Sequence, residues 1–133
     1  TFHTCAIKLD GSLWCWGYGA NGELGVDDVA SRDVPTPVQP GTSWIAVGLG
    51  DRHTCGVRDT GTMWCWGHGN FGQLGLGADT SDRVVPIQVG NDTRWTAVAA
   101  GHYHTCGVKT DGAFVCWGSN TYGQVDMIFK DGF

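Results

Sequence analysis

The sequence predicts an all-β protein assembled from β-propeller blades, each of about four short antiparallel strands, and two observations carry this prediction. The first is a repeat: His-Thr-Cys occurs three times, each time followed by Cys-Trp-Gly, in residues 3–17, 53–67 and 104–118. Corresponding cysteines recur after 50 and then 51 residues, a period typical of proteins built from one repeated supersecondary unit. The second is that β-branched and aromatic residues alternate between glycine-rich turns, without a helical period.

The second repeat, residues 44–94, is complete and defines the unit. Its expected strands cover residues 44–47, 53–57, 63–67 and 85–89. The first repeat, residues 1–43, lacks the opening Trp-x-x-Val strand. The third repeat, residues 95–133, has that strand but diverges at its end, where Gly-Gln-Val-Asp replaces Gly-Gln-Leu-Gly and no proline strand follows. Its tail could still supply an edge strand.

The chain holds fewer than three blades, whereas a closed propeller usually has 4–8. An open arc would expose two apolar blade faces, and such faces rarely persist in water. We therefore expect either a homo-oligomer that closes a ring or a longer chain that supplies the remaining blades. The start at Thr1, two residues before a repeat motif, looks cut from something longer, as a mature product or a fragment would, and both interpretations stay open.

Composition excludes two classes of partner. The net charge is −5 and the eight lysines and arginines are scattered singly, so no basic stripe is available for a phosphate backbone. We expect no nucleic-acid partner. No apolar run approaches the roughly 20 residues that a membrane-spanning helix needs, so we expect no membrane insertion.

The cysteines flank three-residue hairpin loops with glycine in the third position, as in Leu9-Asp10-Gly11, where a left-handed conformation is needed. Counting outward from each loop places the two cysteines of a repeat directly opposite each other. They should occupy a non-hydrogen-bonded position with Cα atoms about 4.5 Å apart, which a disulfide tolerates. The pairs are Cys5 with Cys15, Cys55 with Cys65, and Cys106 with Cys116.

Three interpretations of these pairs compete. One disulfide per blade, the interpretation we favour, implies an oxidising compartment and an extracellular protein. The cysteines could instead be free and buried as small apolar residues. A zinc site is the third option, since His3, Cys5 and Cys15 share one region of the hairpin, but no fourth ligand recurs at a fixed offset. The sequon Asn91-Asp92-Thr93 predicts N-glycosylation at Asn91 and agrees with secretion.

Other patterns have structural explanations. Residues 17–22 and 67–72 match Gly-x-Gly-x-x-Gly, but no helix follows, so they predict recurring turns rather than a nucleotide site. Histidines 3, 53 and 104 stand at equivalent blade positions, which favours a repeated structural hydrogen bond over catalysis. Asp27-Asp28 is a solvated turn, with weak calcium binding as the alternative. We expect no catalytic residue, no cofactor and no metal, and therefore no enzyme.

The spaced motifs Trp-x-x-Val-x-x-Gly-x-x-His-Thr-Cys, Asp-Gly, Trp-Gly, Gly-Gln-Leu-Gly and Pro-x-x-Val resemble the regulator-of-chromosome-condensation repeat over roughly residues 1–125. The resemblance implies a propeller and, from the founding member, guanine-nucleotide exchange as an alternative function. Acidic charge, the missing basic tail and the cysteine pairs argue against exchange. Some members are plant UV-B photoreceptors with tryptophan second in Gly-Trp-Arg-His-Thr. Asp51 and His102 occupy that place here, which argues against photoreception.

Propeller repeats bind through loops at the rims, because their strands are used for packing. The loops that differ between repeats are residues 26–35 and 77–84, together with Asp51, Arg52, His102 and Tyr103. We therefore predict a non-enzymatic module for protein binding or structural assembly, with these four residues as candidate partner contacts. Glycan binding through Tyr18, Phe71 and Tyr122 is an alternative. A hydrolase or lyase using Asp51, His102 and His104 is a further one, without triad geometry.

Overall fold

The computed structural model describes residues 2–120, and this part of the chain is all-β, as predicted. It forms three antiparallel sheets, ordered β1-β2-β3, β4-β5-β6-β7 and β10-β9-β8. No helix in the described residues could span a membrane. The strands are β1 (His3–Ile7), β2 (Leu13–Gly17), β3 (Arg32–Pro37), β4 (Trp44–Leu49), β5 (His53–Arg58), β6 (Met63–Gly67), β7 (Arg83–Gln88), β8 (Trp95–Ala100), β9 (His104–Lys109) and β10 (Phe114–Gly118).

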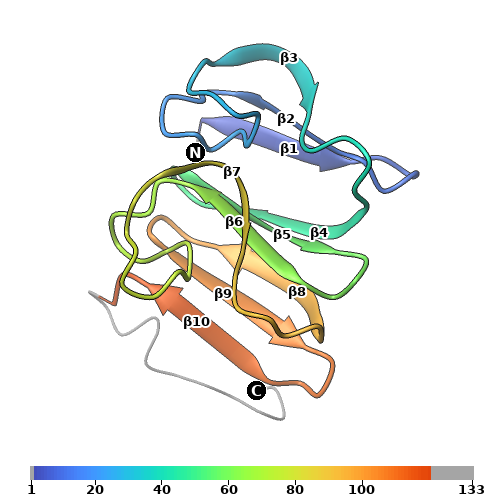
Figure 1. The fold of residues 1–133 in the computed structure, drawn as a ribbon, viewed down its shortest axis with the longest axis vertical. Coiled ribbons are helices and arrows are strands. Elements are labelled where there is room, and N and C mark those ends of the chain that lie inside the picture. Colours follow the sequence, from blue (N-terminus) through green and yellow to red (C-terminus); the bar gives the residue numbers. More distant parts are fainter. Residues whose placement is uncertain (1, 121–133) are drawn as a thin grey trace.

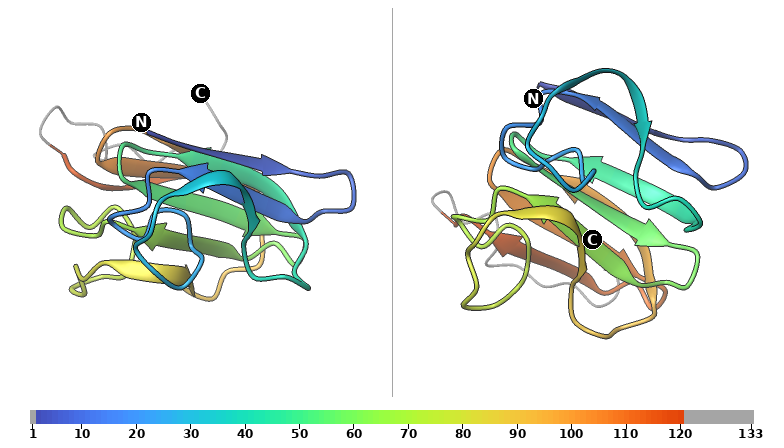
Figure 2. Two further views of the ribbon diagram at one scale, coloured as in Figure 1. Left: turned by 90° about the horizontal axis from the view of Figure 1, so that it is seen from above. Right: turned by 45° about the horizontal axis from the view of Figure 1, so that its top comes forward.

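The three sheets stack face to face as successive propeller blades (Figure 1). Strand β4 contacts β8, and β1 contacts β4, so each blade rests on the strands of the next. The hairpin between β1 and β2 projects at the end of the stack opposite the N-terminus (Figure 2). The described sheets do not close on themselves, and the arc is a partial propeller.

Two strands begin earlier than the sequence predicted. The loops expected at residues 26–35 and 77–84 are too long, because β3 begins at Arg32 and β7 at Arg83. The cause is a register irregularity after Cys15 and again after Cys65, which leaves the glycine at the end of the preceding strand paired with the arginine. A bulge of this kind leaves residues of the longer strand unpaired and bends that strand before the pairing resumes.

The apolar core lies between blades rather than within them. One cluster combines Leu13, Cys15 and Leu24 of the first blade with Trp44 and Trp66 of the second. A second cluster repeats this arrangement one blade further along. The indole rings of Trp44 and Trp66 meet edge to face at 5.6 Å, a favoured aromatic geometry. We call each junction a seam, the first between blades one and two and the second between blades two and three.

The hairpin glycines connect one blade to the next. Gly61, at the third position of its loop, has φ of +80°, and its carbonyl accepts a hydrogen bond from the Trp95 amide at 3.0 Å. Gly11 makes the same bond with the Trp44 amide at 2.8 Å. A Cβ on Gly61 would overlap the carbonyl oxygen of Thr93. The Asp-Gly motif therefore serves both the turn and the seam.

Candidate functional site

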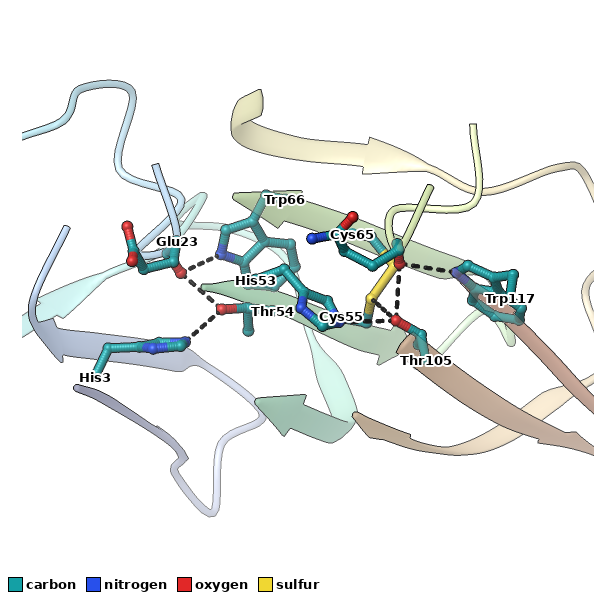
Figure 3. Close-up of a disulfide and its surroundings, with 10 residues drawn as sticks. His3, Glu23, His53, Thr54, Cys55, Cys65, Trp66, Thr105 and Trp117 are labelled. Atoms are coloured by element: carbon teal, nitrogen blue, oxygen red, sulfur yellow. Dashed lines mark hydrogen bonds between the residues drawn. A yellow bond between two sulfur atoms is a disulfide. The ribbon is translucent and has the colours of Figure 1, made fainter. Parts of the chain in front are cut away.

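A chain of hydrogen bonds crosses the first seam (Figure 3). His3 Nε2 lies 2.8 Å from Thr54 Oγ1, and both side chains are buried. Thr54 Oγ1 donates to the carbonyl of Glu23 at 2.7 Å, and Trp66 Nε1 donates to the same carbonyl at 3.0 Å. Because the Thr54 hydroxyl has given its only proton to Glu23, it accepts from His3, which therefore carries its proton on Nε2.

The second seam repeats this chain with different residues. His53 Nε2 lies 2.9 Å from Thr105 Oγ1, and that hydroxyl donates to the Gln73 carbonyl at 2.8 Å. Trp117 Nε1 donates to the same carbonyl at 3.0 Å. The predicted structural role is thus confirmed for the first two motif histidines. This bond also explains why a threonine follows the histidine in His-Thr-Cys. The Gly-Glu/Gln-Leu-Gly turn is placed so that the carbonyl of its second residue, Glu23 or Gln73, faces the next blade.

Burial keeps the seam histidines neutral. Removal from water lowers the pKa of His53 to about 4, and the same cause, with the nearby amino terminus second, lowers the pKa of His3 to about 4. The His53 ring packs directly over Gly50, where any Cβ would overlap it. The Gly-x-x-His spacing of the repeat therefore follows from the space that the ring needs.

Three disulfides link the cysteines in the predicted pairs. The Cα atoms lie 4.1 Å apart in Cys5–Cys15 and Cys55–Cys65, and 4.0 Å apart in Cys106–Cys116. These separations are shorter than the expected 4.5 Å, and no cysteine is free. The Cys55–Cys65 pair is fully buried between blades two and three. Within residues 2–120 no cluster of His, Cys, Asp and Glu side chains could hold a metal ion.

All four predicted partner contacts lie on one rim. One edge of the blades, the edge at which β1 begins, carries four of the connecting segments (Figure 1). They are the loops before β5 and β9 and the glycine-rich turns after β2 and β6. The two loops touch, because the amide of Asp51 donates to the carbonyl of His102 at 3.2 Å. The predicted residues on this rim are Asp51, Arg52, His102 and Tyr103.

An aromatic group bridges blades two and three on this rim. The rings of Phe71 and Tyr103 lie 4.7 Å apart, with His68 6.3 Å from Phe71 and His102 6.2 Å from Tyr103. Phe71 is 46% exposed. We call these four residues the aromatic rim. On the first blade, Phe2 and Tyr18 form a further exposed pair at 6.5 Å.

The contact between the Phe71 and Tyr103 rings, which are tilted by 44°, is the feature that sequence reasoning missed. A signal existed, since each residue stands two places before a member of the seam bond: Phe71 before Gln73, and Tyr103 before Thr105. Tyr122, named with Phe71 as a glycan contact, lies outside the described residues. Asp28, one of the two calcium candidates, forms an exposed ion pair with Arg32 at 2.7 Å, as expected of a solvated turn.

Comparison with known proteins decides the family. The family model of the regulator of chromosome condensation (RCC1) repeat matches residues 10–57 and 60–108, and a second model of the same repeat matches residues 44–73 and 95–124. The chain belongs to the RCC1 repeat family. It is 35% identical over 129 residues to the ultraviolet-B receptor UVR8 of Arabidopsis thaliana, covering 94% of this chain. The match spans 29% of that receptor's length.

Solved structures show the same fold. Human WBSCR16 superimposes with a TM-score of 0.81 at 21% identity, covering 89% of this chain and 31% of that one. Yeast RCC1 (Prp20), solved bound to Kap60, gives 0.79 at 21% identity, covering 90% and 30%. The CRINKLY WD40 ectodomain of the Arabidopsis thaliana receptor kinase ACR4 gives 0.58 at 24% identity, covering 97% and 42%. This chain therefore spans about a third of the length of the first two of these proteins and 42% of the third.

The predicted glycosylation residue lies away from the aromatic rim. Asn91 is exposed in the segment that links β7 to β8, at the end of the stack that carries the hairpins. It lines a hollow between blades two and three together with Trp95, Lys109 and Val115. The second seam therefore carries two separate surfaces. The aromatic rim lies at one edge of the blades, and this hollow lies at the opposite edge.

Proposed function

We propose that this chain is a non-enzymatic RCC1-repeat module that works in an extracellular, oxidising environment and binds a protein partner through the aromatic rim. The observation that carries the proposal is the ring contact between Phe71, which is 46% exposed, and Tyr103 across the second seam. Aromatic residues are enriched at the centres of protein–protein interfaces. Tyr103 is itself one of the four residues predicted as partner contacts, and the ring of a second, His102, lies 6.2 Å from it.

The chemistry of the rim suits a protein surface. Phe71 and Tyr103 offer flat apolar area, and the neighbouring Arg52 side chain is 53% exposed. Binding hot spots are enriched in tyrosine, tryptophan and arginine. The rim is held in place from behind, because the Gln73 carbonyl accepts hydrogen bonds from Thr105 and Trp117. A partner would therefore meet aromatic side chains whose backbone is already ordered, which lowers the entropic cost of binding.

Two findings support an extracellular setting. Disulfides persist in oxidising compartments and are rare in the cytosol, and here one disulfide joins the strands of every blade. The fold is also that of a receptor-kinase ectodomain, ACR4. Prp20 in complex with Kap60 is a propeller of this fold that binds another protein. Its 21% identity supports the fold alone, and we do not extend guanine-nucleotide exchange to this chain.

Site-specific photo-crosslinking tests the proposal. A photoreactive phenylalanine analogue replaces Phe71 in the full chain, expressed in the cells that produce the protein. The control places it at Leu9, a fully exposed residue of the hairpin at the opposite end of the stack. We expect Phe71 to capture one extracellular protein that Leu9 does not capture, and Tyr103→Ala to abolish that capture. Equal capture from both positions, or none from Phe71, would show that the rim is not the binding surface.

A further inference from the structure

The two seams differ in the side chains that fill their outer part, next to the hairpins. In the first seam the guanidinium of Arg58 lies over the rings of Trp44, at 4.9 Å, and Trp64, at 3.7 Å. The same group donates a hydrogen bond to the amide oxygen of Gln39. Arginine, two indoles and an amide thus fill the outer part of this seam between the hairpin end of blade two and the linker from blade one.

The second seam has smaller residues at the corresponding places. Strand register pairs Trp44 with Arg58 and, one blade on, Trp95 with Lys109. It also makes Val115 the counterpart of Trp64, since each faces the glycine of His-Thr-Cys-Gly. The counterpart of Gln39 is Gly90, since each follows a valine whose amide donates to the carbonyl of the first residue of the equivalent strand, β2 in blade one and β6 in blade two. Three of the four side chains that fill the first seam therefore have smaller counterparts in the second seam. Only the tryptophan is the same in both.

The result is a hollow of about 560 Å³ whose walls include Trp95, Trp117, Val89 and Val115. Trp95, the counterpart of Trp44, lacks the side-chain hydrogen bond that Trp44 makes. In the first seam Trp44 Nε1 donates to Thr42 Oγ1 at 2.8 Å. Trp95 is only 6% exposed, yet its buried Nε1 has no partner among the described residues. A buried indole N–H without an acceptor is unfavourable, so an acceptor that enters the hollow would stabilise this seam.

An acceptor for a sugar stands at the border of the same hollow. Asn91 lines it, is exposed, and begins the sequon Asn91-Asp92-Thr93. The corresponding triplet of the first seam is Pro40-Gly41-Thr42, which is no sequon. The sequon thus occurs in the seam that has the hollow and is absent from the seam that arginine fills. This coincidence gives the hollow one specific occupant.

We infer that Asn91 carries an N-linked glycan whose first N-acetylglucosamine folds back into the hollow and completes the second seam. The inference rests on the extracellular setting proposed above, because the modification occurs in the secretory pathway. The Asn91 Nδ2–C1 bond forms as the C1–O bond of a lipid pyrophosphate-linked oligosaccharide breaks. The pyrophosphate leaves with the electron pair, the amide proton goes to a base, and nothing is oxidised or reduced.

The walls of the hollow match the faces of such a sugar. Its apolar C–H face can lie against Trp95 and Val115, and its acetamido or hydroxyl oxygens can accept from Trp95 Nε1. Its hydroxyls can reach the ion pair in which Lys109 Nζ lies 2.8 Å from Asp92 Oδ2. Aromatic platforms bordered by charged hydrogen-bonding groups suit ligands with one apolar and one polar face.

The test compares glycoforms of the full chain secreted from eukaryotic cells. Peptide mass spectrometry should find Asn91 occupied, and an endoglycosidase should trim the glycan to its first sugar. We expect the trimmed and untrimmed forms to have the same Tm, about 3 °C above that of Asn91→Gln and Thr93→Ala made in the same cells. The Trp95 Nε1–H resonance should also shift between trimmed protein and Asn91→Gln. An unoccupied Asn91, or equal Tm values with and without the sugar, would overturn the inference.

A matched control uses the seam that has no hollow. Pro40→Asn creates a sequon with Gly41 and Thr42 at the corresponding position, and Asn91→Gln in the same chain removes the native one. A glycan at residue 40 should leave the Tm of this variant the same as that of the variant without the glycan. A gain in Tm equal to that at Asn91 would mean that glycans stabilise the chain in general, and it would overturn the inference. Because none of these measurements involves the aromatic rim, failure here and failure of the crosslinking experiment are distinguishable.

Discussion

At the scale of single residues, the seam histidines work only in their neutral form. Their folded pKa lies near 4 because of burial, whereas an exposed histidine titrates near 6.5. Below the unfolded pKa the unfolded chain therefore binds more protons than the folded one. The stability that neutral His3 and His53 contribute is present above pH 6.5 and is lost as the pH falls towards 4.

A pH titration of stability checks this prediction. The free energy of unfolding should stay flat above pH 6.5 and fall between pH 6.5 and 4, with His53 accounting for on the order of 3 kcal/mol. Urea denaturation at several pH values measures it. His53→Gln should show a smaller fall over this window than the unmodified chain. An unchanged fall in that variant would mean that other groups produce the pH dependence.

The hydroxyl of Thr105 is the second residue on which a seam depends. Thr105→Val keeps the shape of the side chain but leaves the Nε2–H of His53 without its acceptor in a buried place. We expect a loss of about 2 kcal/mol in the free energy of unfolding, measured by urea denaturation. Thr105→Ser keeps the hydroxyl and should lose less. If Thr105→Val loses no more than Thr105→Ser, which lacks only the methyl group, the hydrogen bond contributes no more than the packing of that methyl group and the prediction is wrong.

At the scale of strands and hairpins, the sequence predicted what local geometry determines. The three-residue loops with glycine third place Cys55 opposite Cys65 by counting alone, and the structure has this register. The starts of β3 and β7 could not be counted in this way, because a bulge after the cysteine shifts the pairing. Contacts between blades were harder still, because the distance between the Phe71 and Tyr103 rings depends on how two sheets dock.

The disulfide within a hairpin should stabilise its blade mainly by restricting the unfolded chain. The two cysteines of the second blade are 10 residues apart and fully buried. Loop-closure entropy for this separation gives about 3 kcal/mol. We expect the double variant Cys55→Ala with Cys65→Ala to lose about that much in urea denaturation. A loss under about 1 kcal/mol would show that strand pairing alone holds the hairpin.

At the scale of the whole molecule, the seams predict how the arc continues. Thr4 and His104 occupy the positions of Thr54 and His53 on opposite end faces of the stack. Thr4 is exposed, whereas Thr54 is fully buried against the neighbouring blade. One end face thus presents the threonine, and the other presents the histidine, of the His–Thr hydrogen bond that crosses each seam. Further blades, from a second copy or from a longer chain, would repeat the same bond. This complementarity follows from the repeat itself and could be predicted once the histidine and threonine were known to pair.

The most direct test of this account is the native mass of the chain under non-reducing conditions. A discrete multiple of the 14.2 kDa chain would mean that copies join through the complementary end faces, and a monomer would mean that the remaining blades belong to a longer chain. Each copy should be lighter by the six hydrogens that three disulfides remove. A monomer would contradict the assembly of separate copies through these faces. Retention of all six thiol hydrogens would contradict the central claim, that each blade is closed by a disulfide and works in an oxidising environment.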